Sequence, residues 1–144
     1  MSTERVEVPT WESLSLIRSQ NVGRICVIDQ GFPIALPVNF KTIGTDDACQ
    51  LVIRTGPATI IGRYEGPASL EVDAVDEKGH EAWSVIVRGT LRHVTGAHGL
   101  PDSGPWLEGR HHWMVLTATA ITGRRFIAHP GTEGFAVDWQ IRMR

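Results

Sequence analysis

Residues 68–94 carry the pattern that most constrains the fold of this chain. Polar and apolar side chains alternate over residues 68–74 and again over residues 84–92, with a polar turn between them. A period of two is typical of strands that bury one face, and two such segments joined by a short turn predict a long antiparallel hairpin. Gly89 marks a close approach of a neighbour or a sharp bend. The polar face that carries Arg88 is either a solvated surface or a row of donors for a ligand.

Further segments of the same kind are separated by turns rich in Gly, Pro and Asp. Pro37 lies inside one of them and cannot donate to a ladder, so an edge, a bulge or a break is expected there. About six strands without a βαβ rhythm favour a mainly β fold built as a small antiparallel barrel. The other strand segments are residues 23–29, 32–40, 51–55, 112–119 and, as a short strand or strand end, 121–127.

One helix is expected near the start of the chain, over residues 11–20. Thr10 is a suitable N-cap residue for it. Trp11, Leu14 and Ile17 recur at helical spacing, so this face of the helix is expected to pack inward.

A second helix is expected over residues 58–65, directly after a strand end and after Pro57, which suits a first helical turn. Such a junction presents unpaired N–H groups and the positive end of the helix dipole to an anion. With Arg54, Thr55 and Thr59 beside it, the junction is the best phosphate-site candidate in the sequence. A purely structural alternative pairs Arg54 with an acidic neighbour and uses the two threonines as caps.

Composition narrows the class of protein. A net charge of −2 argues against a general nucleic-acid binder. No apolar run approaches the roughly 20 residues of a membrane helix, and the first residues lack the apolar core of a signal peptide. Cys26 and Cys49 stand in no metal-binding spacing, and the six histidines form no metal motif, so reduced thiols, a cytoplasmic protein and no metal are expected. The 144 residues are expected to form one domain with tails at residues 1–9 and 128–144.

Seven short motifs follow one another between residues 11 and 127. They are Gly-Arg, Gly-Phe-Pro, Pro-Val-Asn-Phe, Ile-Arg-Thr-Gly-Pro, Leu-Glu-Val-Asp, Trp-Ser-Val-Ile-Val-Arg-Gly and Ile-Thr-Gly-Arg-Arg, at residues 23–24, 31–33, 37–40, 53–57, 70–73, 83–89 and 121–125. In this order they resemble the pyridoxamine 5′-phosphate oxidase-like proteins, the FMN-binding split-barrel group, in their small actinobacterial-type branch.

The resemblance implies a split β-barrel of about six antiparallel strands in Greek-key order, with two or three short helices. It also implies a homodimer with one FMN in each of two clefts between the subunits. The implied cofactor contacts are Arg54, Thr55 and Thr59 around the phosphate, Pro37, Val38, Asn39 and Phe40 along the isoalloxazine ring, and Trp83, Ser84 and Arg88 near the cleft, from the same subunit or from its partner. Arg124 and Arg125 are candidates to close the cleft.

One position departs from the pattern of that family, which usually has a lysine in a Gly-Thr-Lys or Gly-Ser-Lys sequence. This chain has Ala58-Thr59-Ile60 there. Losing one charge-assisted contact costs roughly 10- to 100-fold in affinity. Arg63 lies three residues further along the predicted helix and is a candidate replacement. Weak FMN binding, rescue by Arg63 and a changed ligand stay open.

Three functions follow from these features. The first is an FMN-dependent oxidoreductase acting on a small-molecule substrate, with the redox chemistry supplied by the flavin and no side chain assigned as acid or base. The second is a split barrel that uses the deazaflavin F420 or haem, with His93 as a haem ligand. The third is a non-enzymatic dimer that binds flavin weakly or not at all.

Overall fold

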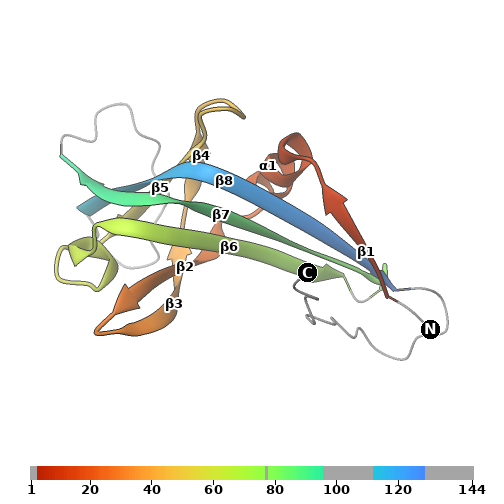
Figure 1. The fold of residues 1–144 in the computed structure, drawn as a ribbon, viewed down its shortest axis with the longest axis horizontal. Helices are drawn as coiled ribbons and strands as arrows, with labels where there is room; N and C mark the ends of the chain where they lie inside the picture. Colours follow the sequence, from red (N-terminus) through yellow and green to blue (C-terminus); the bar gives the residue numbers. More distant parts are fainter. Residues whose placement is uncertain (1–2, 77, 96–111, 129–144) are drawn as a thin grey trace.

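A single antiparallel sheet dominates the computed structural model, which describes residues 3–76, 78–95 and 112–128 (Figure 1). The mainly β class expected from the alternating segments is confirmed. In chain order the elements are β1 (Thr3–Val8), α1 (Thr10–Arg18), β2 (Val22–Asp29), β3 (Phe32–Asn39), β4 (Lys41–Ile43), β5 (Gln50–Thr55), the 3-10 turn η1 (Ile61–Arg63), β6 (Gly66–Asp76), β7 (Glu81–Val94) and β8 (His112–Ala128).

The sheet runs in the order β3-β2-β6-β7-β8-β5-β4, and β1 pairs with residues 123–128 at the end of β8. The long strands β6, β7 and β8 lie side by side along its middle (Figure 1). β3, at one end of this order, also contacts β5 near the other end. The sheet therefore curls round until its ends approach each other, and it encloses the core on its concave face.

The predicted central hairpin is confirmed as β6 and β7. The two strands pair in one register, with Leu70 opposite Val87, and the face that holds both residues is buried. The same face of β8, the inner side of α1 and buried residues of β2 and β5 add to this core. The buried residues that these elements share include Leu14, Ile17, Leu70, Val72, Val85, Val87, Leu91, Met114 and Leu116.

Gly89 causes the irregularity expected of it. The β7–β8 register shifts between Arg88 and Gly89, which is the signature of a β-bulge. A Cβ atom on Gly89 would overlap the carbonyl oxygen of Thr117 on β8. Both expectations for this residue, a close approach and a bend, are therefore met.

Helix α1 differs from the prediction at its first turn. Pro9 occupies the N-cap position without a side-chain cap bond, so Thr10 is not the cap. Leu14 and Ile17 are fully buried as predicted, but Trp11 is 64% exposed, so its inward packing is wrong. Ser13 completes the buried face instead, because β8 approaches the helix at Gly123, where only a small side chain fits.

The predicted second helix, residues 58–65, is wrong. Only the three-residue turn η1 forms there. The hydroxyl of Thr59 donates to the carbonyl oxygen of Gly56 and accepts the N–H of Gly62. Side-chain bonds of this kind compete with the backbone bonds of a helix, and the segment closes as two tight turns.

Three strands depart from their predicted limits. Residues 1–9 were expected to be a tail, but Thr3–Val8 forms β1 against β8. The short β4 was not predicted, and the two segments expected at residues 112–127 are one continuous strand, β8. The expected tail at residues 128–144 lies outside the described residues beyond Ala128.

Pro37 lies on β3, which is an edge strand in the described sheet, so the edge is the correct one of the three expected options. The β2–β3 register runs without interruption past Pro37 to Asn39, so these two strands contain neither a bulge nor a break.

Among the described residues, no helix has the length and hydropathy of a membrane span. In the same part of the chain, no three side chains of His, Cys, Asp or Glu gather as the ligands of a metal ion would.

Candidate functional site

The end of β5 brings two of the predicted phosphate contacts together. The hydroxyl oxygens of Thr55 and Thr59 lie 2.8 Å apart. Thr59 donates its proton to the carbonyl oxygen of Gly56, also at 2.8 Å, so Thr55 must be the donor to Thr59. The local backbone holds this pair, because the N–H of Gly62 donates to Thr59 Oγ1 at 3.0 Å.

Arg54 does not join this pair within the sheet. Neighbouring residues of a strand point to opposite faces, and Arg54 lies over the ring of Trp113, 5.1 Å from its centroid. Thr55 shares the other face with the fully buried Ile53. The predicted trio is thus divided into a hydroxyl pair on the core face and a guanidinium on the outer side.

Ile60, which stands where the family that the sequence resembles usually has lysine, has its side chain turned inward. Ile60 is partly buried and packs against the core. Arg63, the candidate replacement, is exposed on η1, and its backbone N–H donates to the carbonyl oxygen of Thr59. Arg63 therefore lies one turn along the chain from Thr59, and its role at a phosphate stays a prediction.

The segment from Pro37 to Phe40 ends just before β4, the strand that pairs with β5. Phe40 is 1% exposed and anchors the strand end, with its N–H bonded to Asn21 O at 3.0 Å. The β4–β5 ladder begins with Lys41 opposite Val52. β3, which ends at Asn39, also contacts β5.

Trp83 and Ser84 lie far from the hydroxyl pair in one chain. They are at the start of β7, whereas Val94 at its end pairs with Trp113, the partner of Arg54. At about 3.3 Å per residue, Trp83 and Ser84 lie roughly 35 Å along β7 from Val94. Trp83 packs against the core there and Ser84 is 6% exposed.

Arg88 lies in a surface groove on the outer face of the sheet. The groove has a volume of about 440 Å³, within the range of small-molecule sites. The Arg88 guanidinium has no ion pair in the described part of the chain. Other residues that line the groove are Cys26, Ile28, Pro33, Ser69 and Thr119.

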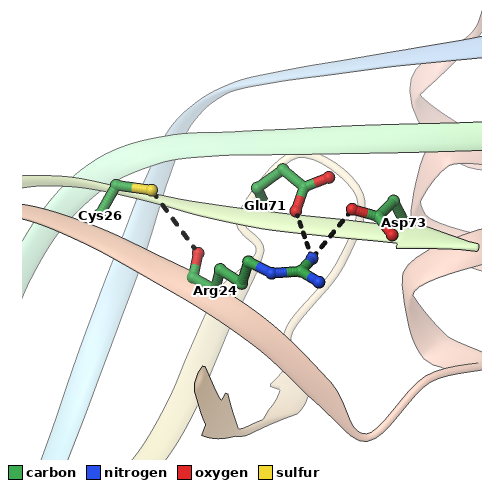
Figure 2. Close-up of polar contacts among 4 residues, drawn as sticks. All are labelled: Arg24, Cys26, Glu71 and Asp73. Atoms are coloured by element: carbon green, nitrogen blue, oxygen red, sulfur yellow. Dashed lines mark hydrogen bonds and ion pairs between the residues drawn. The ribbon is translucent and has the colours of Figure 1, made fainter. Parts of the chain in front are cut away.

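A charged cluster on the same outer face was missed from the sequence. Arg24 Nη1 lies 3.1 Å from Glu71 Oε2 and 2.9 Å from Asp73 Oδ2, so one guanidinium holds two carboxylates (Figure 2). Burial, and next the neighbouring Asp73, raise the pKa of Glu71 to about 7 against the opposing effect of Arg24. The available signal was the i, i+2 spacing of Glu71 and Asp73 on the polar face of a predicted strand.

Cys26 borders this cluster (Figure 2). Its Sγ lies 3.9 Å from the carbonyl oxygen of Arg24, and burial raises the pKa of the thiol. A protonated thiol is a poor nucleophile, so the geometry gives Cys26 a packing role beside the groove.

Arg125, placed at the cleft edge by the family resemblance, is engaged elsewhere. Its guanidinium pairs with Glu12 of α1 at 2.8 Å and with Glu81 of β7. The side chain thereby ties the helix to the sheet. Arg124 lies opposite Ser84 in the β7–β8 ladder, at the far end from the hydroxyl pair.

Two histidines were not recognised as a pair from the sequence. The rings of His93 and His112 stack with centroids 3.7 Å apart and planes 3° from parallel. His112 Nε2 is buried and finds no hydrogen-bond partner in the described part of the chain. A metal ion lies in the plane of each imidazole that binds it, so two parallel rings at this spacing cannot share one ion.

Comparison with known proteins places this geometry in context. The family model described as pyridoxamine 5′-phosphate oxidase matches residues 10–125. The FAD-binding protein of Mycobacterium smegmatis is 26% identical, with a TM-score of 0.65 over 85% of this chain and 99% of that one. A conserved protein of unknown function from Corynebacterium diphtheriae is 25% identical, with a TM-score of 0.71 over 85% and 98%.

An FAD-binding protein of Mesorhizobium loti shares the fold at 18% identity, with a TM-score of 0.70 over 88% of this chain and 100% of that one. A search among curated proteins finds no match. The structural matches confirm the split-barrel fold expected from the sequence motifs.

Proposed function

We propose, from the premise that this chain belongs to the pyridoxamine 5′-phosphate oxidase family, that it is an oxidoreductase that binds FMN between two copies of the chain. The M. smegmatis relative is described as an FAD-binding protein, which supports a flavin and makes FAD the second candidate cofactor. When bound, the flavin supplies the two-electron chemistry, and the protein binds and orients it.

The observation that carries the proposal is the distance between the two groups of expected contacts. Thr55 and Thr59 lie at one end of the barrel, and Trp83 and Ser84 lie roughly 35 Å away along β7. A site that uses both groups needs a second copy of the chain. The outer face of the sheet, with its groove at Arg88, is the surface on which we place that copy.

The residues at the barrel end offer a flavin phosphate one charged contact fewer than the family usually provides. Ile60 packs inward where the family has lysine, and the hydroxyl protons of Thr55 and Thr59 are donated to Thr59 Oγ1 and to the carbonyl oxygen of Gly56. Unless another side chain supplies the contact that the lysine makes, binding is expected to be weaker than in a member that has the lysine, by roughly 10- to 100-fold.

A visible absorption spectrum of the purified protein, recorded before and after incubation with FMN and desalting, tests the proposal. We expect flavin bands that survive desalting, and chromatography of the released nucleotide then distinguishes FMN from FAD. Bleaching of those bands by candidate reductants tests the oxidoreductase activity. A Soret band indicates haem, and retention of F420 alone indicates the deazaflavin. A protein that retains no chromophore overturns the flavin proposal and leaves the non-enzymatic alternative.

A further inference from the structure

The hydroxyl pair is continued across the sheet by a histidine. Thr55 and His112 are direct partners in the β5–β8 ladder, next to the pair Ile53 and Met114. Ile53 and Met114 are fully buried, and Arg54 and Trp113 occupy the opposite face. Thr55 and His112 therefore share the core face at the barrel end, where directly opposed residues have Cβ atoms about 5 Å apart.

Among the described residues, the hydroxyl pair leaves no donor free at this end of the barrel. Each threonine has one hydroxyl proton, and both protons are used, by Thr55 toward Thr59 and by Thr59 toward Gly56 O. Ile60 offers no side-chain donor. His112 Nε2 is buried without a hydrogen-bond partner in the described part of the chain, and leaving a buried polar atom unpaired is costly unless a ligand meets it.

The ring of His112 is also held in place. His93, on the neighbouring strand β7, stacks on it in parallel at 3.7 Å. Stacking fixes the ring plane but uses neither of the ring nitrogens of His112, so Nε2 stays available in a fixed position.

We propose that His112 is a cofactor-binding residue, which donates a hydrogen bond from Nε2 to the flavin phosphate and supplies the contact that Ile60 does not. This assignment rests on the proposed function, because it concerns the phosphate of the same flavin. Two side chains are thus candidates for the contact that lysine makes elsewhere in the family. One is the half-buried imidazole of His112 beside Thr55, and the other is the exposed guanidinium of Arg63.

The test compares FMN with riboflavin, which has the same ring system and no phosphate. Dissociation constants for both are measured by quenching of flavin fluorescence. His112→Phe keeps an aromatic ring to stack on His93 and removes Nε2. We expect FMN affinity to fall roughly 10-fold or more, as for loss of one hydrogen bond to a charged group, with riboflavin affinity unchanged.

Further variants keep the test decisive. His112→Gln keeps a side-chain donor and is expected to recover part of the FMN affinity. His112→Leu, which has no donor, replaces His112→Phe if that variant does not fold. Arg63→Ala measures the competing candidate, and we expect a smaller loss from it than from His112→Phe.

Each remaining outcome overturns the assignment. Unchanged FMN affinity in His112→Phe removes His112 from the phosphate site and leaves the flavin proposal standing. Equal losses for FMN and riboflavin show that His112 shapes the fold and not the phosphate contact. A wild-type chain that binds no flavin of either kind overturns the proposed function and this assignment with it.

Discussion

At the scale of single residues, the guanidinium of Arg24 contacts two carboxylates, those of Glu71 and Asp73. One guanidinium cannot fully compensate Glu71 and Asp73 together, and Glu71 is also partly buried. Burial and the neighbouring carboxylate both disfavour its charged form. The cluster therefore carries a proton into the neutral pH range.

The pH dependence of stability follows from the raised pKa of Glu71. The folded chain holds the Glu71 proton up to about pH 7, whereas the unfolded chain releases it near the ordinary value of 4.5. This contribution to stability is complete below about pH 4.5 and is lost as the pH rises through about 7. Glu71→Gln, which does not titrate, is therefore expected to gain stability relative to wild type between pH 5 and pH 8.

Because Glu71 is also partly open to solvent, we expect the gain to be at most about 1 kcal/mol. Urea unfolding at several pH values measures it, with the exposed Glu65→Gln as the matched control. Stability curves of Glu71→Gln and wild type that run parallel over this range would contradict the assignment.

At the scale of elements, the bulge at Gly89 sets how β7 fits against β8. A methyl group at this position would overlap the carbonyl oxygen of Thr117, which belongs to the sheet backbone and cannot move aside locally. Gly89→Ala is expected to destabilise the fold by about 2 kcal/mol or more. Thr90→Ala, one residue further along β7, is the control and is expected to cost about 1 kcal/mol or less.

Thermal or urea unfolding of the two variants checks this prediction. Equal stability of Gly89→Ala and Thr90→Ala would mean that the strands can separate at the bulge without cost.

Elements whose pattern repeats could be predicted from the sequence, and elements decided by one contact could not. The β6–β7 hairpin follows from strict alternation, and the buried face of α1 from Leu14 and Ile17. The helix expected at residues 58–65 fails because the Thr59 hydroxyl bonds to its own loop. Trp11 is exposed because Gly123 brings β8 close to Ser13 and not to the tryptophan.

The candidate site likewise has parts that could be predicted from the sequence and parts that could not. The proximity of Thr55 and Thr59 could be predicted because both lie at the same strand end, and their hydroxyl groups are in contact. Their role at a phosphate site stays a prediction. The position of Arg54 on the other face depends on the strand alternation at Ile53 and Thr55, which the sequence also contained. The stacked His93 and His112 could not be predicted, because their contact depends on the register between β7 and β8.

At the scale of the whole molecule, the outer face of the sheet decides the assembly that we propose. Ile28 is 55% exposed on this face and lines the groove that contains Arg88. Ile28→Glu is expected to weaken association of two copies and to lower flavin affinity at the same time, because the site needs both copies. Trp11→Glu, at an exposed position on α1, is the control and is expected to change neither property.

Light scattering and flavin titration of the two variants at one protein concentration measure both effects. Loss of association in Ile28→Glu with unchanged flavin affinity would show that one chain contains the complete site.

Sedimentation velocity, followed at the visible absorbance of FMN, tests the central claim most directly. The chain has a mass of 15.9 kDa. We predict that the flavin sediments with a species of twice that mass and that each chain carries one flavin. Flavin that sediments with a single chain would contradict the shared site, and flavin that does not sediment with the protein would contradict flavin binding itself.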